Sequence, residues 1–312
     1  MSMSKTALFF PGQASQYVGM GKDLYEASAE VKRLYSLASD LIGENLATLS
    51  FEGPAERLKQ TRFTQPAILV HSLAVLTVMG DKLPPFDFAA GHSLGEYGAL
   101  AVAGAMSFED AVRAVARRAT LMEEACQKNP GTMAAVMGLD ADTTERICVE
   151  ASDQGVVIPA NFNSAVQIAV SGHIVSVEKA VQLAREQGAK RAVMLEVGGA
   201  FHSPLMASAK DGMEACLREI TVKAPTKPVV ANVTARPVDG GDDIRRLLVE
   251  QITSPVRWAQ TMQYLTDQGV TRVIEVGPGK VLSSLAKRDM RPESIVTLDT
   301  LADVESFSAQ SD

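Results

Sequence analysis

The chain has 312 residues, of which 46% are hydrophobic and 21% are charged, and its formal net charge is −7. This length and composition are typical of a soluble globular protein with one large or two smaller domains. The acidic balance disfavours nucleic acid or an anionic membrane as the main partner. We expect no membrane-spanning segment and no signal peptide, and therefore a cytoplasmic location. A monomer is the default expectation.

The three cysteines are Cys126, Cys148 and Cys216, and they form no CxxC or Cys/His pattern. Such widely spaced cysteines are typical of side chains that fill space in helices. The sequence therefore implies neither a metal site nor a cofactor.

The first third of the chain alternates short apolar strands with helical stretches. Strands are predicted at 6–10 and 86–90, and helices at 67–79, 94–104 and 108–126. This alternation favours a mostly parallel sheet covered by helices, which is an α/β fold.

The pattern changes at Pro130 and becomes β-α-β-β-α-β, the order of a ferredoxin-like fold. The predicted elements are a strand at 132–139, a helix at 141–152, strands at 155–162 and 167–172, a helix at 174–188 and a strand at 191–197. Asn163 and Ser164 are expected to form the turn between the two middle strands. We interpret 130–197 as a small domain inserted into a large one made of 1–129 and 198–312.

The large domain resumes with a predicted helix at 203–220, a strand at 228–233 and a strand turning into a helix at 272–280. The last segment has the phosphate-loop appearance of "EVGPGK", but it lacks the P-loop spacing. The polar tail at 302–312 is expected to be frayed.

The stretch "GHSLGEY" places Ser93 between a predicted strand and a predicted helix. A G-x-S-x-G serine in that context indicates a nucleophile elbow, and the helix N-terminus would direct N–H groups at an oxyanion. The alternative is a serine that only caps a helix in a tight turn.

A nucleophilic serine needs a base, and the chain has four histidines. His71 lies in an apolar helical stretch, His173 follows a predicted hairpin, and the side chain of His92 should point away from its neighbour Ser93. His202 lies in the glycine-rich loop "GGAFHSPLM" at the junction of the two domains, where loops line clefts, and it is the best candidate. Many acids lie between Ser93 and His202, but none stands out in a loop after a strand, which weakens a plain hydrolase interpretation.

The loop "FFPGQASQ" follows the first strand and should lie at the carboxyl ends of the strands, close to Ser93. Its backbone could supply a second oxyanion donor. An ordinary turn is the alternative.

Seven motifs together resemble the malonyl-CoA:acyl carrier protein transacylases, a family related to the acyltransferase domains of polyketide synthases. The motifs are "FPGQASQ", "TQPAI", "GHSLGEY", "RATLM", "NFNS", "GAFHS" and "EVGPGK", and they span residues 6 to about 297. The resemblance implies a hydrolase-like large domain with a ferredoxin-like insertion. It also implies transfer of a malonyl group from coenzyme A to the phosphopantetheine thiol of acyl carrier protein.

The same resemblance implies roles for individual residues. Ser93 would carry the acyl group and His202 would be its base, oriented by the main-chain carbonyl of Gln251. The backbone N–H groups of Gln13 and Leu94 would form the oxyanion hole.

The resemblance further implies that Arg118 holds the free carboxylate of the malonyl group. Asn161 and His92 would lie at the substrate-binding surface. The form "GAFHS" resembles the one linked with malonyl rather than methylmalonyl selection.

Two positions depart from the family pattern. Ala14 stands where the first loop usually has glycine, which imposes strain if that residue has a positive φ. Ala119 follows Arg118 where glycine is usual. Because Arg117 is adjacent, the arginine of the family motif is either Arg118, as assigned, or Arg117. We expect Arg117 to lie on a solvated helix face.

Two other functions stay open: a serine hydrolase or thioesterase, and a non-catalytic acyltransferase-like interaction protein. The acceptor could be a fatty-acid, polyketide or malonate-decarboxylase carrier protein. An acidic carrier protein would need a local basic surface on this acidic chain. The candidate docking residues are Lys190, Arg191, Lys287 and Arg288.

Overall fold

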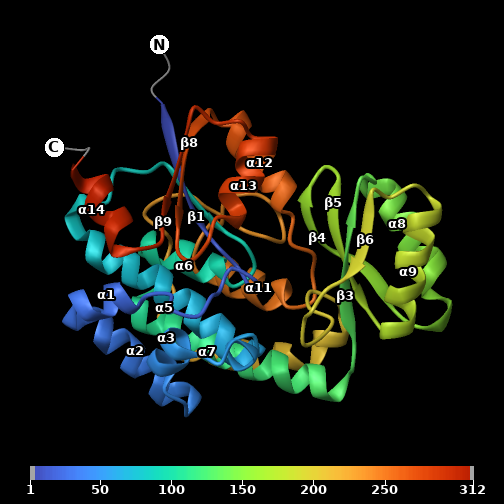
Figure 1. Cartoon of the computed structure of the whole chain (residues 1–312), viewed down its shortest axis with the longest axis horizontal. Helices are drawn as coiled ribbons and strands as arrows, with labels where there is room; N and C mark the ends of the chain where they lie inside the picture. The colour runs from blue at the N-terminus through green and yellow to red at the C-terminus, as the bar shows by residue number, and fades with distance from the viewer. Residues whose placement is uncertain (1–3, 310–312) are drawn as a thin grey trace.

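Two β-sheets organise the chain in the computed structural model, which describes residues 4–309 (Figure 1). Sheet A has five parallel strands in the order β7-β2-β1-β8-β9. Its strands are β1 (Lys5–Phe10), β2 (Phe88–Gly91), β7 (Val229–Val230), β8 (Val270–Val276) and β9 (Ser294–Leu298). The order reverses at β1, so the loops after β1 and β8 diverge there and leave room for a ligand.

Helices cover both faces of sheet A, as the apolar strand β1 requires. Ala7 and Phe9 pack against α12 (Trp258–Asp267) and α13 (Val281–Asp289). Leu8 and Phe10 belong to the larger core on the opposite face, which includes α5, α6 and α7. These three helices are α5 (Thr61–Met79), α6 (Gly95–Val102) and α7 (Phe108–Lys128). Because successive side chains of a strand point to opposite faces, a strand covered on both sides is apolar throughout.

Sheet B is antiparallel, with the strand order β4-β5-β3-β6. The chain passes through it as β3 (Thr132–Met137), α8 (Ala141–Ala151), β4 (Val157–Ser164), β5 (Gln167–Gly172), α9 (Ile174–Glu186) and β6 (Arg191–Met194). This is the ferredoxin-like arrangement, and with parallel sheet A it confirms the predicted fold class. Figure 1 shows sheet B and its helices as a separate lobe beside sheet A.

Alternation along β3 gives sheet B one packed face and one open face. Ala134 and Val136 pack against α8 and α9 in the core of this lobe. Met133, Ala135 and Met137 point the other way and line a cavity toward sheet A. A period of two residues along one strand therefore builds both the small core and one wall of the cavity.

All four strands of sheet B lie between residues 130 and 197, and all five strands of sheet A lie outside that range. Two backbone hydrogen bonds of 2.9 Å join the lobes, from Phe162 N to Val256 O and from Val256 N to Ala160 O. The division into domains at 129/130 and 197/198 stays a prediction.

The remaining helices complete the large lobe. They are α1 (Lys22–Ala27), α2 (Ala29–Ile42), α3 (Leu46–Glu52), α4 (Ala55–Leu58), α10 (Lys210–Glu219), α11 (Gly241–Gln251) and α14 (Leu301–Ala309). The sequence analysis did not predict α1–α4.

Three local predictions were wrong. The residues expected as a turn, Asn163 and Ser164, belong to β4, and the turn is at 165–166. The predicted helix at 203–220 is a 3₁₀ turn at Pro204–Ala209 followed by α10. The polar tail is not frayed up to residue 309, because α14 buries Val304 and Phe307 against the core. Residues 310–312 lie outside the described part.

One apolar stretch is longer than the sequence analysis expected. The segment 61–82, which is α5 and the turn that follows it, is long and apolar enough to cross a membrane by length and composition alone. Its most apolar window is 83% buried inside the protein. This helix is apolar all round because it lies in the core between other helices.

Candidate active site

Ser93 lies in a sharp turn between β2 and α6, and its φ of 53° falls in the left-handed region. The flanking glycines permit this turn. A Cβ added at Gly91 would come within 2.0 Å of Gly95 C, and one added at Gly95 would come within 2.1 Å of Phe10 O. Any side chain at either position would push α6 away from the strands, so the G-x-S-x-G spacing is a steric requirement.

Ser93 and His202 are in contact across 109 residues of sequence. Ser93 Oγ lies 2.7 Å from His202 Nε2, and His202 Nδ1 lies 2.9 Å from the main-chain oxygen of Gln251. A carbonyl can only accept, so Nδ1 carries the proton and Nε2 is free to accept from the serine hydroxyl. Like Ser93, His202 has a positive φ, of 57°.

The environment of His202 keeps its imidazole neutral. Burial and, second, the positive charge of Arg118 lower the pKa of His202 to about 3. At neutral pH the ring therefore carries only the proton on Nδ1, and Nε2 is free to accept one.

Arg118 is a fully buried cation beside Ser93. Its Nη2 donates to Ser93 Oγ (3.1 Å) and to Gln251 Oε1 (2.9 Å), and its Nη1 donates to Gln65 Oε1 (2.6 Å). Within residues 4–309 these side-chain partners are all neutral, and its buried Nε has none. Burial lowers the pKa of Arg118, which still remains charged. Arg117 is exposed, so Arg118 is the arginine that reaches the site.

A buried polar network that the sequence analysis missed supports these groups. Asn232 Oδ1 accepts from Ser93 N (2.6 Å), and Asn232 Nδ2 donates to Gly91 O (2.6 Å). Glu96 Oε2 accepts from Asn232 N (3.0 Å) and from Gln251 Nε2 (2.8 Å). Asn232 stands at the end of the predicted strand 228–233, and that position was the signal that could have indicated it.

Two backbone N–H groups beside Ser93 are available to a ligand. Within the described residues, neither Gln13 N nor Leu94 N donates a hydrogen bond. Leu94 N belongs to the first turn of α6, and Gln13 belongs to the loop after β1. Ala14, next to Gln13, has a φ of 79°, so the alanine that replaces glycine in this loop does sit in the left-handed region.

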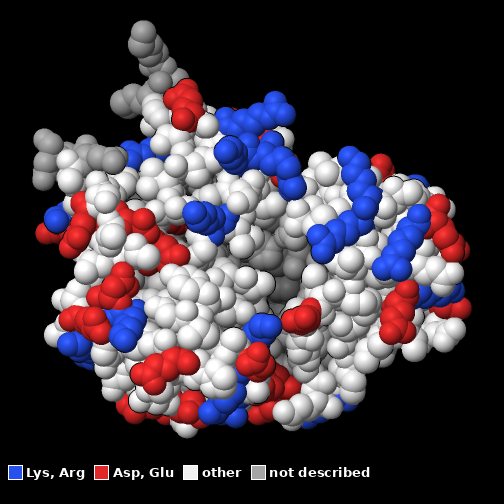
Figure 2. All heavy atoms as spheres, viewed as in Figure 1, with Lys and Arg blue, Asp and Glu red and all other residues white. Residues whose placement is uncertain are grey.

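Of the predicted substrate-binding residues, His92 and Asn161 line one cavity of about 310 Å³ between the two lobes, whereas Arg118 is fully buried and is not part of its lining. Ser93, His202 and Gln13 also line this cavity. Asn161 Oδ1 is buried and has no partner among the described residues. His92 Nε2 bonds to Asn163 Oδ1 at 2.8 Å, and burial lowers the pKa of His92. Figure 2 shows the hollow between the lobes, with basic side chains on both sides of it.

The four candidate docking residues are all exposed. Lys190 and Arg191 lie at the start of β6, and Lys287 and Arg288 lie in the last turn of α13. Arg288 pairs with Asp289 at 3.2 Å and reaches Gln167 of sheet B at 3.3 Å. Part of its charge is therefore neutralised.

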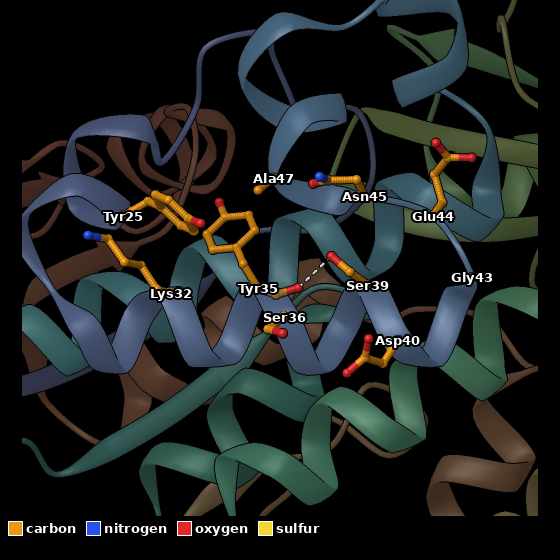
Figure 3. A pocket seen from close by; sticks show the side chains of 10 residues that line it. All are labelled: Tyr25, Lys32, Tyr35, Ser36, Ser39, Asp40, Gly43, Glu44, Asn45 and Ala47. Atoms are coloured by element: carbon orange, nitrogen blue, oxygen red, sulfur yellow. Dashed lines mark hydrogen bonds between the residues drawn. The ribbon is translucent and has the colours of Figure 1, made fainter.

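A larger cavity, of about 520 Å³, lies on the N-terminal helices (Figure 3). It is lined by Tyr25, Lys32, Tyr35, Ser36, Ser39, Asp40, Gly43, Glu44, Asn45 and Ala47. Among the described residues, neither serine of this cavity is hydrogen-bonded to a basic side chain, and Ser39 Oγ donates to Tyr35 O instead. Volume alone therefore does not identify the functional site. The part of the chain that the structure describes also contains no group of three or more metal-ligating side chains.

The fold and this site define an acyltransferase. The model of the acyl transferase domain matches residues 8–303 of the chain.

Curated relatives narrow the class further. The chain is 45% identical over 287 residues to the malonyl CoA-acyl carrier protein transacylase of Bacillus subtilis, covering 92% of this chain and 90% of the relative. It is 44% identical over 289 residues to the Escherichia coli K12 protein of the same name, covering 92% and 93%. The chain belongs to the malonyl CoA-acyl carrier protein transacylase family.

Solved structures agree with that assignment. The transacylase structure from Coxiella burnetii superposes with a TM-score of 0.93 at 37% identity, covering 98% of both chains. A malonyl-transacylase in complex with a type II polyketide-synthase acyl-carrier protein superposes with a TM-score of 0.92 at 39% identity. That match covers 98% of this chain and 100% of the other.

The buried Glu96 makes a prediction about stability and pH. Burial raises the pKa of Glu96 from 4.5 to about 7, so the native protein holds a proton more tightly than the unfolded chain does. Between pH 4.5 and 7 the wild type should therefore lose stability as the pH rises, by about 3 kcal/mol in total. Glu96→Gln removes this titration. Its free energy of unfolding relative to wild type, measured in urea, should rise by that amount across the interval and then level off. A difference that stays flat from pH 4.5 to 8 would contradict the prediction.

Proposed function

We propose that this protein transfers a malonyl group from coenzyme A to the phosphopantetheine thiol of an acyl carrier protein, through a malonyl ester of Ser93. The observation that carries the proposal is the 2.7 Å contact between Ser93 Oγ and a neutral His202 at a strand-to-helix elbow. A serine paired with a base at such an elbow is the arrangement used for acyl transfer.

In the first half-reaction Ser93 Oγ attacks the thioester carbonyl while His202 Nε2 takes the hydroxyl proton. The N–H groups of Gln13 and Leu94 bind the oxyanion, because within residues 4–309 they carry no other hydrogen bond. When the C–S bond breaks, His202 returns the proton to the coenzyme A thiolate. In the second half-reaction the carrier thiol gives its proton to His202 and attacks the ester, and Ser93 leaves with that proton.

Arg118 binds the free carboxylate of the malonyl group in this proposal. A buried guanidinium with only neutral partners lacks a counter-charge, and a malonyl carboxylate would supply one. The unpartnered Nε is a donor still available to it. Arg118 also donates to Ser93 Oγ, which stabilises negative charge on that oxygen during attack.

The two alternative functions explain less of the site. A serine hydrolase would use Ser93 and His202 but has no need of a buried cation beside them. A non-catalytic scaffold would need neither the aligned pair nor the strained backbone at Ser93 and His202.

Several finer points belong to the proposal. The protein acts in the cytoplasm as a monomer, without metal or cofactor, and coenzyme A enters only as part of the substrate. The carrier protein belongs to fatty-acid or polyketide synthesis, and Asn161 and His92 contact the substrate.

Loss of the nucleophile tests the proposal directly. After brief exposure to malonyl-CoA, intact-mass spectrometry should show one malonyl adduct on the wild type and none on Ser93→Ala. His202→Ala should slow the formation of that adduct by roughly 10²- to 10⁴-fold, the range for removal of a positioned base. An adduct that persists on Ser93→Ala would overturn the proposal.

Arg118 should select acyl chains that carry a second carboxylate. Arg118→Ala should lower the ratio of malonyl to acetyl transfer by roughly 10²-fold, because a charge-assisted contact to malonyl is lost and acetyl never made it. The ratio, measured on one preparation, does not depend on the folded fraction. Arg117→Ala removes an exposed arginine one residue away and should leave the ratio unchanged. Equal losses for both acyl groups in Arg118→Ala would indicate a structural role instead.

We further propose that the carrier protein docks on the basic residues at the rim of the cavity. Carrier proteins of this kind are strongly acidic, and a chain of net charge −7 repels them on average. Local positive charge must therefore guide the approach. Lys190 and Arg191 belong to one lobe and Lys287 and Arg288 to the other, so a partner bound to both pairs would span the cavity.

Charge reversal of each pair tests this surface. Lys190→Glu with Arg191→Glu, and Lys287→Glu with Arg288→Glu, should each raise the KM for carrier protein several-fold and weaken its dependence on salt. The malonyl-CoA half-reaction should change little. Lys32 and Arg33 form an adjacent, exposed basic pair on α2, far from the cavity, and their reversal is the matched control. If both rim pairs behave like this control, the docking surface lies elsewhere.

A further inference from the structure

The loop between β1 and α1 carries Gln13, and its own hydrogen bonds are few. Ser15 Oγ donates to Gly12 O at 2.7 Å, and Ala14 N donates to Gln16 Oε1 at 2.9 Å. The strained φ of 79° at Ala14 works against the conformation that these bonds hold. Contacts from outside the loop therefore bear on the direction of Gln13 N.

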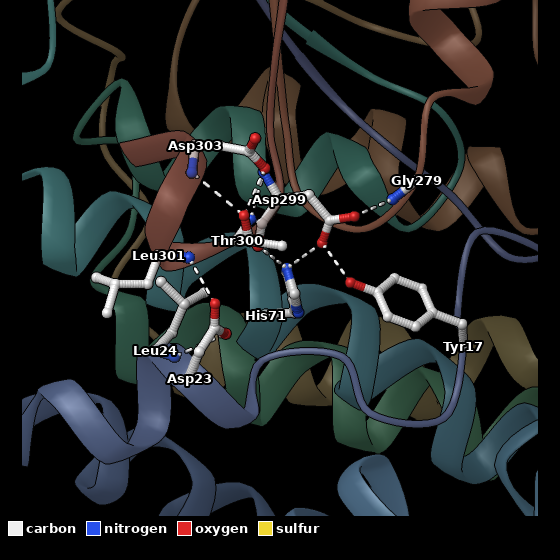
Figure 4. Close-up of polar contacts among 9 residues, drawn as sticks. All are labelled: Tyr17, Asp23, Leu24, His71, Gly279, Asp299, Thr300, Leu301 and Asp303. Atoms are coloured by element: carbon white, nitrogen blue, oxygen red, sulfur yellow. Dashed lines mark hydrogen bonds and ion pairs between the residues drawn. The ribbon is translucent and has the colours of Figure 1, made fainter. Parts of the chain in front are cut away.

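Asp299 supplies that contact from the other end of the chain (Figure 4). Its Oδ1 accepts from the hydroxyl of Tyr17 at 2.9 Å, and its Oδ2 accepts from Gly279 N at 3.1 Å. Tyr17 lies in the same loop as Gln13, four residues further along, and Gly279 lies in the loop between β8 and α13. One carboxylate therefore joins the two loops that diverge where the strand order of sheet A reverses.

His71 fixes the carboxylate from below. It lies fully buried in α5, with Nε2 at 3.0 Å from Asp299 Oδ1 and 2.8 Å from the Asp299 main-chain oxygen. Although burial opposes ionisation, the contact with His71 and the hydrogen bonds from Gly279 and Tyr17 hold the pKa of Asp299 below its usual value. Burial and the charge of Asp299 raise the pKa of Tyr17, so its hydroxyl remains a donor.

The backbone around Asp299 is also anchored. Asp303 Oδ2 accepts from Asp299 N and Thr300 N, and Asp23 Oδ2 accepts from Leu301 N at 2.7 Å. Asp299 thus has a fixed main chain and a fixed side chain, and it holds the loop of Gln13 from outside. The same loop has a second outside anchor further along, from Gly19 N to Ser50 O at 2.8 Å.

We propose that Asp299, held by His71, is a positioning residue that acts through Tyr17 and Gly279 to hold the oxyanion donor of Gln13 in place. The inference rests on the proposed function, because it assumes that Gln13 N binds an oxyanion. Complete loss of such a donor costs about 10²- to 10³-fold in rate. A donor that stays in the site but is held less firmly should lower the rate by a smaller factor.

Tyr17→Phe removes one hydroxyl at a partly exposed position, so the fold should persist. Its rate constant for acylation of Ser93, per active site counted by burst amplitude, should fall about 3- to 10-fold. Asp299→Asn disturbs both loops, so its rate constant for acylation should fall about 10- to 100-fold. The KM for malonyl-CoA should stay within about twofold. Tyr264→Phe is the control, because within residues 4–309 the Tyr264 hydroxyl makes no hydrogen bond, and its rate should equal that of the wild type.

The ratio of malonyl to acetyl transfer distinguishes positioning from a general disturbance of the site. Every acyl group forms the same oxyanion, so both variants should slow malonyl and acetyl equally, whereas Arg118→Ala changes the ratio. The variant that combines Tyr17→Phe with Asp299→Asn should acylate Ser93 no more slowly than Asp299→Asn alone. Both changes break the same connection, between Tyr17 and Asp299, so their effects should not add. Wild-type rates per active site in both variants, even with lowered thermal stability, would overturn the inference and leave the proposed function intact. Failure of the wild type to acylate Ser93 would overturn the proposed function itself.

Discussion

The close approach of helix α6 to the end of strand β1 is the constraint on which the site depends. At Gly95 there is no room for even one methyl group beside Phe10 O, and at Gly91 the chain nearly touches Gly95. This contact forces the chain through a left-handed turn at Ser93. The turn directs the Ser93 side chain away from the sheet and places the N–H group of Leu94, at the start of α6, beside the Ser93 hydroxyl. The nucleophile and one oxyanion donor follow from a single backbone geometry. The hydrogen bond from Ser93 N to Asn232, in the turn after β7, then holds that geometry.

The second organising feature is a positive charge buried without an ion pair. Arg118 reaches Ser93, Gln251 and Gln65, and the nearest buried acid, Glu96, is separated from it by the carboxamide of Gln251. Glu96 attracts the Nε2 end of that carboxamide, so the Oε1 end faces the guanidinium. The cation is thus oriented by neutral groups, and its own charge remains for a ligand. Its charge also lowers the pKa of His202, so one side chain contributes both to substrate selection and to the state of the base.

Much of this could be predicted from the sequence, because strong local signals fix it. Strand-to-helix alternation indicated sheet A, and the β-α-β-β-α-β order indicated sheet B. Ser93 followed from its glycine spacing and His202 from the poor placement of the other histidines. Helices α1, α3 and α4 were missed because they have only 6, 7 and 4 residues, whereas α2 has 14 residues and a regular buried apolar face that the sequence analysis overlooked. Helix α14 was missed because the tail at 302–312 is largely polar, and only Val304 and Phe307 are large apolar side chains buried in the helix. Asn232 contacts Glu96 and Ser93 across 136 and 139 positions, and Asp299 contacts His71 and Tyr17 across 228 and 282 positions. No local pattern encodes such pairs.

The missing carboxylate behind His202 has a physical reason in this site. A carboxylate at the position of the Gln251 carbonyl would still fix the tautomer, but it would bring a full negative charge close to Arg118. That charge would compete with a malonyl carboxylate for the guanidinium and would raise the pKa of His202. The main-chain carbonyl orients the ring at 2.9 Å without adding a net charge. A thioester is activated enough for a serine with a neutral histidine to attack it, so the stronger base that a carboxylate would create is not required. Orientation by a neutral group is therefore the arrangement that lets a dicarboxylic acyl chain and a histidine base share one small cavity.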